Sequence, residues 1–196
     1  MRSVSFERFA GVCAILAAAA GFLYALFFIV VQNHLLWALF LMLSGLLSSA
    51  VLVAVYNRLR ETQAAFALWA LVLGIAGSVG SAIHGGYDLS LAINPLPTNP
   101  DLPSQVDPRG LLSFLVLGIA LFIIGWLIRR GEHFPKGLGY LGYASAILLV
   151  ILYLGRLIIF EASSLLILVP AVLNGFLVNP AFYLWLGVVL WSARRP

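Results

Sequence analysis

Six long apolar runs, separated by short polar segments, constrain this chain more than any other feature. The first run, residues 9–31, has 23 consecutive residues without a charged side chain. An α-helix rises about 1.5 Å per residue, so roughly twenty residues cross a hydrocarbon layer about 30 Å thick. The runs show no polar–apolar alternation, and lipid leaves the backbone of an open strand unsatisfied, so helices are expected. The predicted spans are residues 9–31, 35–56, 64–83, 111–128, 138–160 and 165–191.

The composition agrees with a lipid bilayer as the solvent for most of the surface. Of 196 residues, 63% are hydrophobic and only 9% are charged, whereas about a quarter of the residues in an ordinary soluble domain are charged. We therefore predict an all-α fold, a polytopic transmembrane helix bundle of six helices that forms a single domain over residues 1–196. The first run is longer than the apolar core of a secretory signal, and we expect it to be retained as a helix.

The basic residues predict the orientation of the bundle. With six spans, nine of the eleven basic residues fall on one side, which is typical of cytoplasmic loops. Both termini are therefore expected in the cytoplasm. Because this pattern explains the positive net charge, we expect no nucleic-acid partner. The nine residues are Arg2, Arg8, Arg58, Arg60, Arg129, Arg130, Lys136, Arg194 and Arg195.

Prolines and small residues predict where the bundle is irregular and where it packs tightly. Residues 94–110 hold five of the nine prolines and are expected to form an outer loop. Pro180 predicts a kink near Asn179 in the last span. Small residues recur on the second and third spans, which we therefore place in the bundle interior. They are Ser44, Gly45, Ser48 and Ser49, and then Gly74, Gly77, Ser78, Ser81, Ala82 and Gly85.

Ionisable and polar side chains near the outer ends of the spans suggest a ligand-binding site. His84 and Asp88 share a helix face at i, i+4 spacing, and Tyr153 and Arg156 share one at i, i+3 spacing. Charges within a membrane are costly and call for partners, so Asp88 is the expected partner of Arg156. The alternative is a structural role, in which Arg156 reaches the headgroups or fixes the helix register. The candidate binding residues are His84, Tyr87, Asp88, Tyr153, Arg156 and Asn179.

No pattern in the chain predicts catalysis or a metal site. The only lysine, Lys136, falls in a loop, which excludes a lysine Schiff base inside the bundle. Zinc-protease spacing and phosphate-binding glycine loops are absent from the sequence. We expect no enzyme activity, no metal and no cofactor. The one cofactor alternative is a haem or chlorophyll with His84 as the axial ligand, since neutral imidazole commonly fills that role.

Two short segments resemble a known group of proteins. The segments Leu138-Gly139-Tyr140-Leu141-Gly142 and Asn179-Pro180-Ala181-Phe182-Tyr183-Leu184-Trp185-Leu186-Gly187 are similar to those of a broad group of uncharacterised bacterial six-span integral membrane proteins. The resemblance covers about the last third of the chain and the general layout of apolar runs. It implies a location in the bacterial cytoplasmic (inner) membrane, and it departs from the group at Val188, where related chains often carry a basic residue.

These features leave three functional interpretations open. The first is a non-enzymatic accessory or scaffold subunit, whose partners are the lipid bilayer and other membrane protein subunits, because the short loops leave no separate domain to do other work. The second is a binder or transporter of a small molecule or lipid, with a polar site in the outer leaflet. The third is haem or chlorophyll binding through His84.

Overall fold

A computed structural model describes residues 4–95, 108–159 and 164–192, and the described residues contain helices and no strand. The all-α prediction is therefore confirmed. Helix bounds, in chain order, are α1 (Val4–Ala25), η1 (Leu26–Val31), α2 (His34–Ile93), α3 (Pro108–Arg130), α4 (Lys136–Ile158), α5 (Leu165–Leu173), η2 (Asn174–Val178) and α6 (Asn179–Trp191). The segments η1 and η2 are π-helical turns that continue α1 and α5 without a loop.

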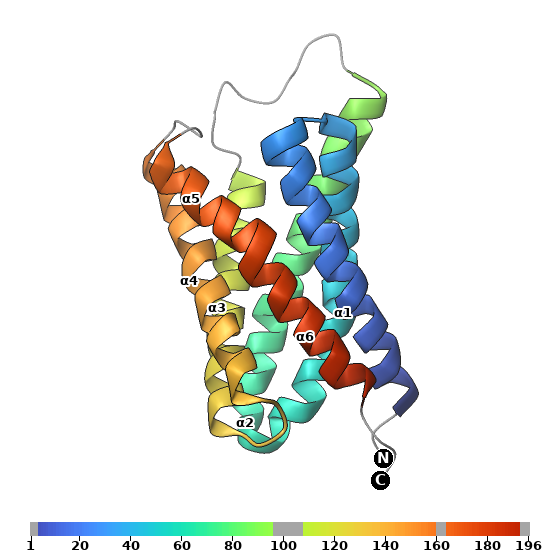
Figure 1. Cartoon of the computed structure of the whole chain (residues 1–196), viewed down its shortest axis with the longest axis vertical. Coiled ribbons are helices and arrows are strands. Elements are labelled where there is room, and N and C mark those ends of the chain that lie inside the picture. The colour runs from blue at the N-terminus through green and yellow to red at the C-terminus, as the bar shows by residue number, and fades with distance from the viewer. Residues whose placement is uncertain (1–3, 96–107, 160–163, 193–196) are drawn as a thin grey trace.

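Helix α2 consists of two helical halves joined at a break. Its 60 residues include one non-helical residue, Gln63, with φ −156° and ψ 102°. The halves fold back on each other (Figure 1). Their close approach is clear at two glycines: a Cβ on Gly45 would lie 2.7 Å from the backbone nitrogen of Ala82, and a Cβ on Gly85 would lie 2.7 Å from the carbonyl oxygen of Ala38. In both contacting pairs the two residue numbers add to nearly the same value, which is the pattern of an antiparallel hairpin. The small residues predicted for the bundle interior therefore allow its two backbones to approach closely.

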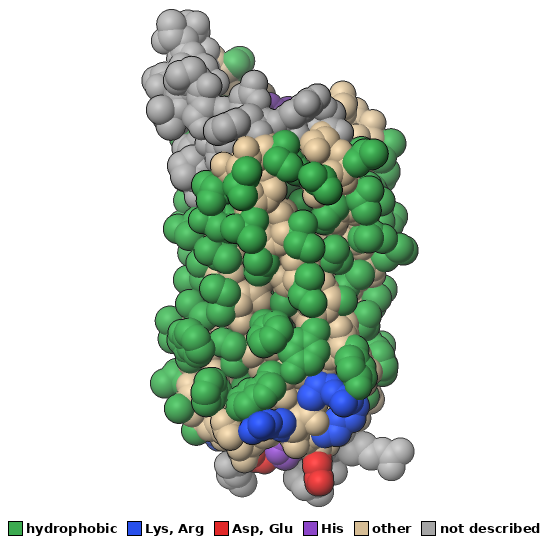
Figure 2. Space-filling model, turned by 90° about the vertical axis from the view of Figure 1, so that its left-hand side faces the viewer, with side chains coloured by type: hydrophobic (Ala, Val, Ile, Leu, Met, Phe, Trp, Pro, Cys, Tyr) green, Lys and Arg blue, Asp and Glu red, His purple; other side chains and the backbone are tan. Residues whose placement is uncertain are grey.

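The bundle has two chemically different ends. The start of α1, the break in α2, the connection from α3 to α4 and the end of α6 lie at one end (Figure 1), which we call the arginine end after Arg58, Arg60, Arg129 and Arg130. Lysine and arginine side chains gather at that end in Figure 2, and hydrophobic side chains cover the face above them. Exposed apolar side chains come from every long helix and include Phe9, Leu46, Trp69, Ile119, Ile151 and Leu177.

Five helices of the described chain are long and apolar enough to cross a membrane when α2 counts once. An unbroken helix of 60 residues would be about 90 Å long, roughly three times the hydrocarbon thickness, so α2 fits a bilayer only as a folded hairpin. The apolar helices are compatible with membrane insertion. Six crossings and a cytoplasmic location of both termini stay predictions.

Glycines in the two segments that carry the resemblance lie at helix contacts. A Cβ on Gly187 of α6 would lie 2.9 Å from the carbonyl oxygen of Gly11 in α1, and one on Gly139 of α4 would lie 2.9 Å from that of Gly125 in α3. Each pair therefore brings two backbones to a distance that no larger residue permits. Packing explains why these segments contain glycine.

The helices extend beyond two predicted boundaries. Helix α2 continues past the predicted span 64–83 to Ile93 and carries His84 and Asp88 inside the helix, while the membrane bounds of that span stay a prediction. The predicted loop 94–110 ends too late, since α3 already begins at Pro108. Proline is favoured in the first turn of a helix, where its missing N–H has no partner to lose. Residues 96–107 of that loop lie outside the described residues.

Candidate functional site

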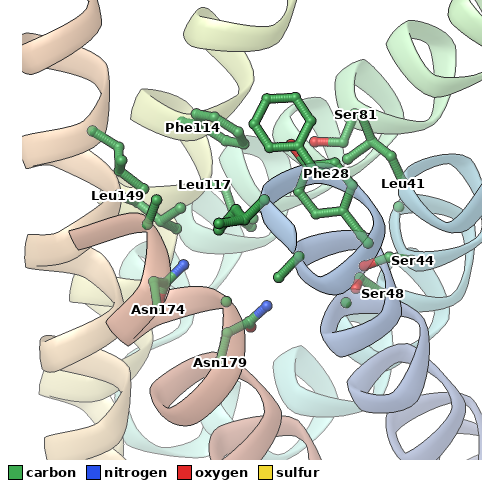
Figure 3. A pocket seen from close by; sticks show the side chains of 18 of the residues that line it. Phe28, Leu41, Ser44, Ser48, Ser81, Phe114, Leu117, Leu149, Asn174 and Asn179 are labelled. Carbon is green, nitrogen blue, oxygen red and sulfur yellow. The ribbon is translucent and has the colours of Figure 1, made fainter. Parts of the chain in front are cut away.

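A cavity of about 250 Å³ lies between the helices. Figure 3 shows side chains that line it. Every helical segment contributes to its wall. Most of the wall is apolar, and among the described residues Arg156 is the one charged residue in it. The lining residues that carry polar side chains are Tyr24, Ser44, Ser48, Ser78, Ser81, Arg156, Asn174, Asn179 and Tyr183.

The two halves of α2 supply four serines to one side of the cavity. Ser81 donates its hydroxyl to the carbonyl oxygen of Gly77 at 3.0 Å, which is the usual way for a serine inside a helix to satisfy itself. Ser48 is hydrogen-bonded to the side chain of Tyr183. Ser78 differs from both, because its residue is only 1% exposed and its hydroxyl has no hydrogen-bond partner within the described residues. A buried hydroxyl without a partner destabilises a protein by about 1–3 kcal/mol, so this group calls for an explanation.

The π-helical turn η2 supplies the opposite side. Pro180 has no N–H to donate back to the preceding turn, and the N–H of Asn179 instead reaches the carbonyl oxygen of Asn174, five residues earlier. In an α-helix, residues five apart point about 140° from each other. The widened turn brings both asparagines to the cavity wall, and Figure 3 shows their amide groups directed across the cavity from Ser44 and Ser48. The kink predicted near Asn179 is therefore a π-helical turn.

The amide of Asn174 is held by a neighbouring helix. The hydroxyl of Ser145 in α4 donates to Oδ1 of Asn174 at 2.9 Å, and both residues are buried. This bond occupies the acceptor of the carboxamide and leaves its Nδ2 donor to face the cavity. Asn179 lies against Gly21 of α1, where a Cβ would be 3.4 Å from its Nδ2. Asn174 is therefore held by a hydrogen bond, and the amide of Asn179 lies beside α1.

The predicted binding residues divide between the cavity and its surroundings. Arg156, in the last turn of α4, and Asn179 line the cavity. His84 and Asp88 come together as the i, i+4 spacing predicts, with 3.2 Å between Nε2 and Oδ2. Tyr87 and Tyr153 are half-buried and lie outside the lining set.

The His84–Asp88 pair belongs to an aromatic cluster near the start of α2. The ring of Trp37 lies 6.4 Å from that of His84 and 4.9 Å from that of His34, measured between centroids. Tyr24, which also lines the cavity, packs against Trp37 at 6.3 Å. The Asp88 contact occupies Nε2 of His84, one of the two nitrogens through which a histidine binds haem iron.

Sequence reasoning missed a buried ion pair at the arginine end. Glu7 in α1 accepts hydrogen bonds from Arg58 in α2, with 3.3 Å from Nε to Oε1 and 3.0 Å from Nη2 to Oε2. The guanidinium also lies over the ring of Phe134, 5.2 Å from its centroid. Arg58 was interpreted only as a basic residue flanking a span. An acidic residue three positions after the start of the first helix was the available signal.

Sequence reasoning also missed Asn174, Ser145 and the unpaired hydroxyl of Ser78. Their roles depend on contacts between helices that are far apart in the chain, and the only local signal was the pairing of Asn174 with Asn179 around a proline. No group of three or more potential metal ligands comes together in the part of the chain that the structure describes.

No protein-family model, curated protein or solved structure matches the chain. The resemblance to uncharacterised bacterial six-span membrane proteins therefore stays a prediction.

Proposed function

We propose that this protein is a multi-pass membrane protein that binds a small lipid-phase molecule in the cavity between its helices. The observation that carries the proposal is Ser78, a residue of the cavity wall whose hydroxyl is buried and has no partner among the described residues. A protein that left this group unpaired in its working state would be less stable without any gain. A ligand that bonds to it supplies the reason.

The proposal includes a bundle with six membrane crossings, in which α2 crosses twice and the arginine end faces the cytoplasm of a bacterium. The concentration of basic residues at one end supports this orientation through the positive-inside rule. The cavity then lies in the outer half of the membrane. Substrates dissolved in the outer leaflet would reach it by moving between helices.

The orientation is tested with single cysteines in a background where the only cysteine, the buried Cys13, is replaced by alanine. Asn94→Cys lies after the end of α2, and Glu132→Cys lies in the connection between α3 and α4. A membrane-impermeant maleimide added to intact cells is expected to label the first and spare the second. The opposite pattern, or labelling of both, would refute the orientation.

Binding is tested by filling the cavity at Gly21. A Cβ at Gly21 would make only ordinary contacts, the nearest at 3.4 Å, so Gly21→Leu is expected to fold and to place its side chain in the cavity. Gly86→Leu is the matched control, because a Cβ there would lie 3.6 Å from the sulfur of Met42, away from the cavity. Mass spectrometry of organic extracts should find a stoichiometric small molecule with the wild-type protein and with Gly86→Leu, and none with Gly21→Leu. Identical extracts from all three proteins would contradict the proposal.

The other two interpretations find less support in the geometry. A scaffold subunit would bind its partners through the lateral surface of the bundle. Contact with lipid is enough to explain the exposed apolar side chains of that surface, so they do not indicate a protein partner. A haem or chlorophyll on His84 would need space beside its ring, but the ring packs near Trp37 and does not border the cavity. Binding without catalysis agrees best with a wall whose polar groups, among the described residues, are amides, hydroxyls and the guanidinium of Arg156.

A further inference from the structure

The polar groups on the two facing sides of the cavity share one chemical property. Ser44, Ser48 and Ser78 on α2 and Asn174 and Asn179 around η2 are all uncharged. We propose that they form a hydrogen-bonding site for a carbonyl oxygen on an uncharged lipid-phase molecule. This inference rests on the proposed binding function and names the chemical class of the ligand.

The asparagines indicate that the ligand group is an acceptor. The Ser145 hydroxyl occupies Oδ1 of Asn174 at 2.9 Å, so Asn174 presents its Nδ2 donor. The Nδ2 of Asn179 lies against Gly21 at the same cavity, and Figure 3 shows both amides directed inward. Two amide donors at one site match a carbonyl oxygen, which has two lone pairs.

The Ser78 hydroxyl is the second observation for this class of ligand. The Ser78 residue is 1% exposed, its hydroxyl is unpaired within the described residues, and the residue belongs to the part of the cavity wall that α2 supplies. A hydroxyl can donate to the same carbonyl oxygen, which then satisfies the serine. A purely apolar occupant would leave the hydroxyl and both amide donors buried without partners.

The volume of the cavity limits the size of the bound group. A dry apolar cavity of about 150 Å³ holds one benzene molecule. By proportion, the 250 Å³ cavity holds about ten non-hydrogen atoms. The occupant is therefore a small ketone, ester or quinone-like molecule, or the carbonyl-bearing end of a longer lipid.

Three probes of this size, each with about ten non-hydrogen atoms, test the proposal on the full-length protein in nanodiscs. The probe 2-nonanone carries a neutral carbonyl, decane carries no polar group, and octanoate carries a charge that Arg156 in the cavity wall could attract. Binding is measured as the rise in thermal midpoint that is lost in Gly21→Leu and kept in Gly86→Leu. We expect 2-nonanone to bind roughly tenfold more tightly than decane and octanoate, because decane offers the buried donors no acceptor and octanoate loses the hydration of its charge.

Two substitutions identify the groups that hold the carbonyl. Ser78→Ala and Asn179→Leu are each expected to weaken 2-nonanone binding roughly five- to tenfold and to leave decane binding unchanged. Ser49→Ala is the matched control, because the Ser49 hydroxyl donates to the carbonyl oxygen of Leu46 at 2.6 Å outside the cavity wall. Ser78→Ala removes only one oxygen atom and adds no bulk, so this variant is expected to fold. It therefore tests the carbonyl site even if Asn179→Leu does not fold.

The outcomes separate this inference from the proposed function. Preference for 2-nonanone that depends on Ser78 supports both. Cavity-dependent binding of decane or octanoate that equals or exceeds that of 2-nonanone overturns the carbonyl site and leaves the binding function standing. Absence of cavity-dependent binding for all three probes overturns the inference and the proposed function together.

Discussion

The Glu7–Arg58 pair allows a quantitative test of how the arginine end of the bundle is held together. Each side chain keeps only 9% of its surface exposed, and two hydrogen bonds of 3.3 and 3.0 Å join them. Glu7→Gln keeps the shape of the side chain but leaves the buried guanidinium without a counter-charge. Breaking a buried pair on one side costs about 3–5 kcal/mol. The ring of Phe134 still stabilises the cation, so we expect a loss of about 2–4 kcal/mol.

The assay is thermal unfolding of the purified protein in lipid bicelles, followed by circular dichroism. For a chain of this size, 1 kcal/mol corresponds to about 2–4 °C in the midpoint, so Glu7→Gln should lower it by roughly 4–16 °C. Glu61→Gln is the matched control. Its carboxylate lies 3.2 Å from Nε2 of His133, but 46% of its side-chain surface is exposed, so the same substitution should cost no more than about 1 kcal/mol.

The double variant Glu7→Gln/Arg58→Gln shows whether charge is the cause. It removes both charges, and its loss of stability should be clearly smaller than the sum of the two single losses. A Glu7→Gln midpoint within about 2 °C of the Glu61→Gln midpoint would refute the reasoning. So would a double variant whose loss equals the sum.

Three further outcomes follow from other contacts in the bundle. Gly45→Ala should destabilise the protein by several kcal/mol, because its Cβ would meet the backbone of the other half of α2. Gly86→Ala, the control, should change stability by less than about 1 kcal/mol. Thermal unfolding of both variants measures the difference. Ser145→Ala should lower stability by about 1–3 kcal/mol, measured in the same way, since it leaves Oδ1 of the buried Asn174 unpaired. Pro180→Ala restores a backbone N–H donor and should convert η2 to regular α-helix. The affinity for 2-nonanone should then fall, while the stability of the protein should not. A ligand titration measures the affinity, and thermal unfolding measures the stability.

The helical layout was predictable because hydrophobic length is a local property of the sequence. The break at Gln63, for instance, falls inside the polar segment that separates the predicted spans 35–56 and 64–83. The i, i+4 pairing of His84 with Asp88 was predictable for the same reason, since it depends on one helix alone. The helices nevertheless extend beyond the apolar runs used to predict the spans, to Ile93 in α2 and from Pro108 in α3.

The cavity was not predictable, because it depends on contacts between helices distant in sequence. Ser78 and Gly45 were both recognised as small residues that permit close packing, and Gly45 has that role. Nothing in the local sequence distinguishes Ser78, whose hydroxyl has no helix acceptor, from Ser81, whose hydroxyl bonds to Gly77. The two serines differ only in the folded bundle, where the surrounding helices bury the Ser78 hydroxyl without a partner and the Ser81 hydroxyl is oriented toward the carbonyl oxygen of Gly77.

The stability of this bundle and its proposed function make opposite demands on the same residues. Pro180 removes a backbone hydrogen bond and Ser78 buries an unpaired hydroxyl, and both features lower the stability of the empty protein. Ser78 lines the cavity, and Pro180 follows Asn179, which lines it too. Destabilising features beside a cavity are expected of a binding site. Ser78→Ala should therefore raise the thermal midpoint of the empty protein and lower its affinity for the ligand. A lower midpoint would show that the hydroxyl has a structural role instead.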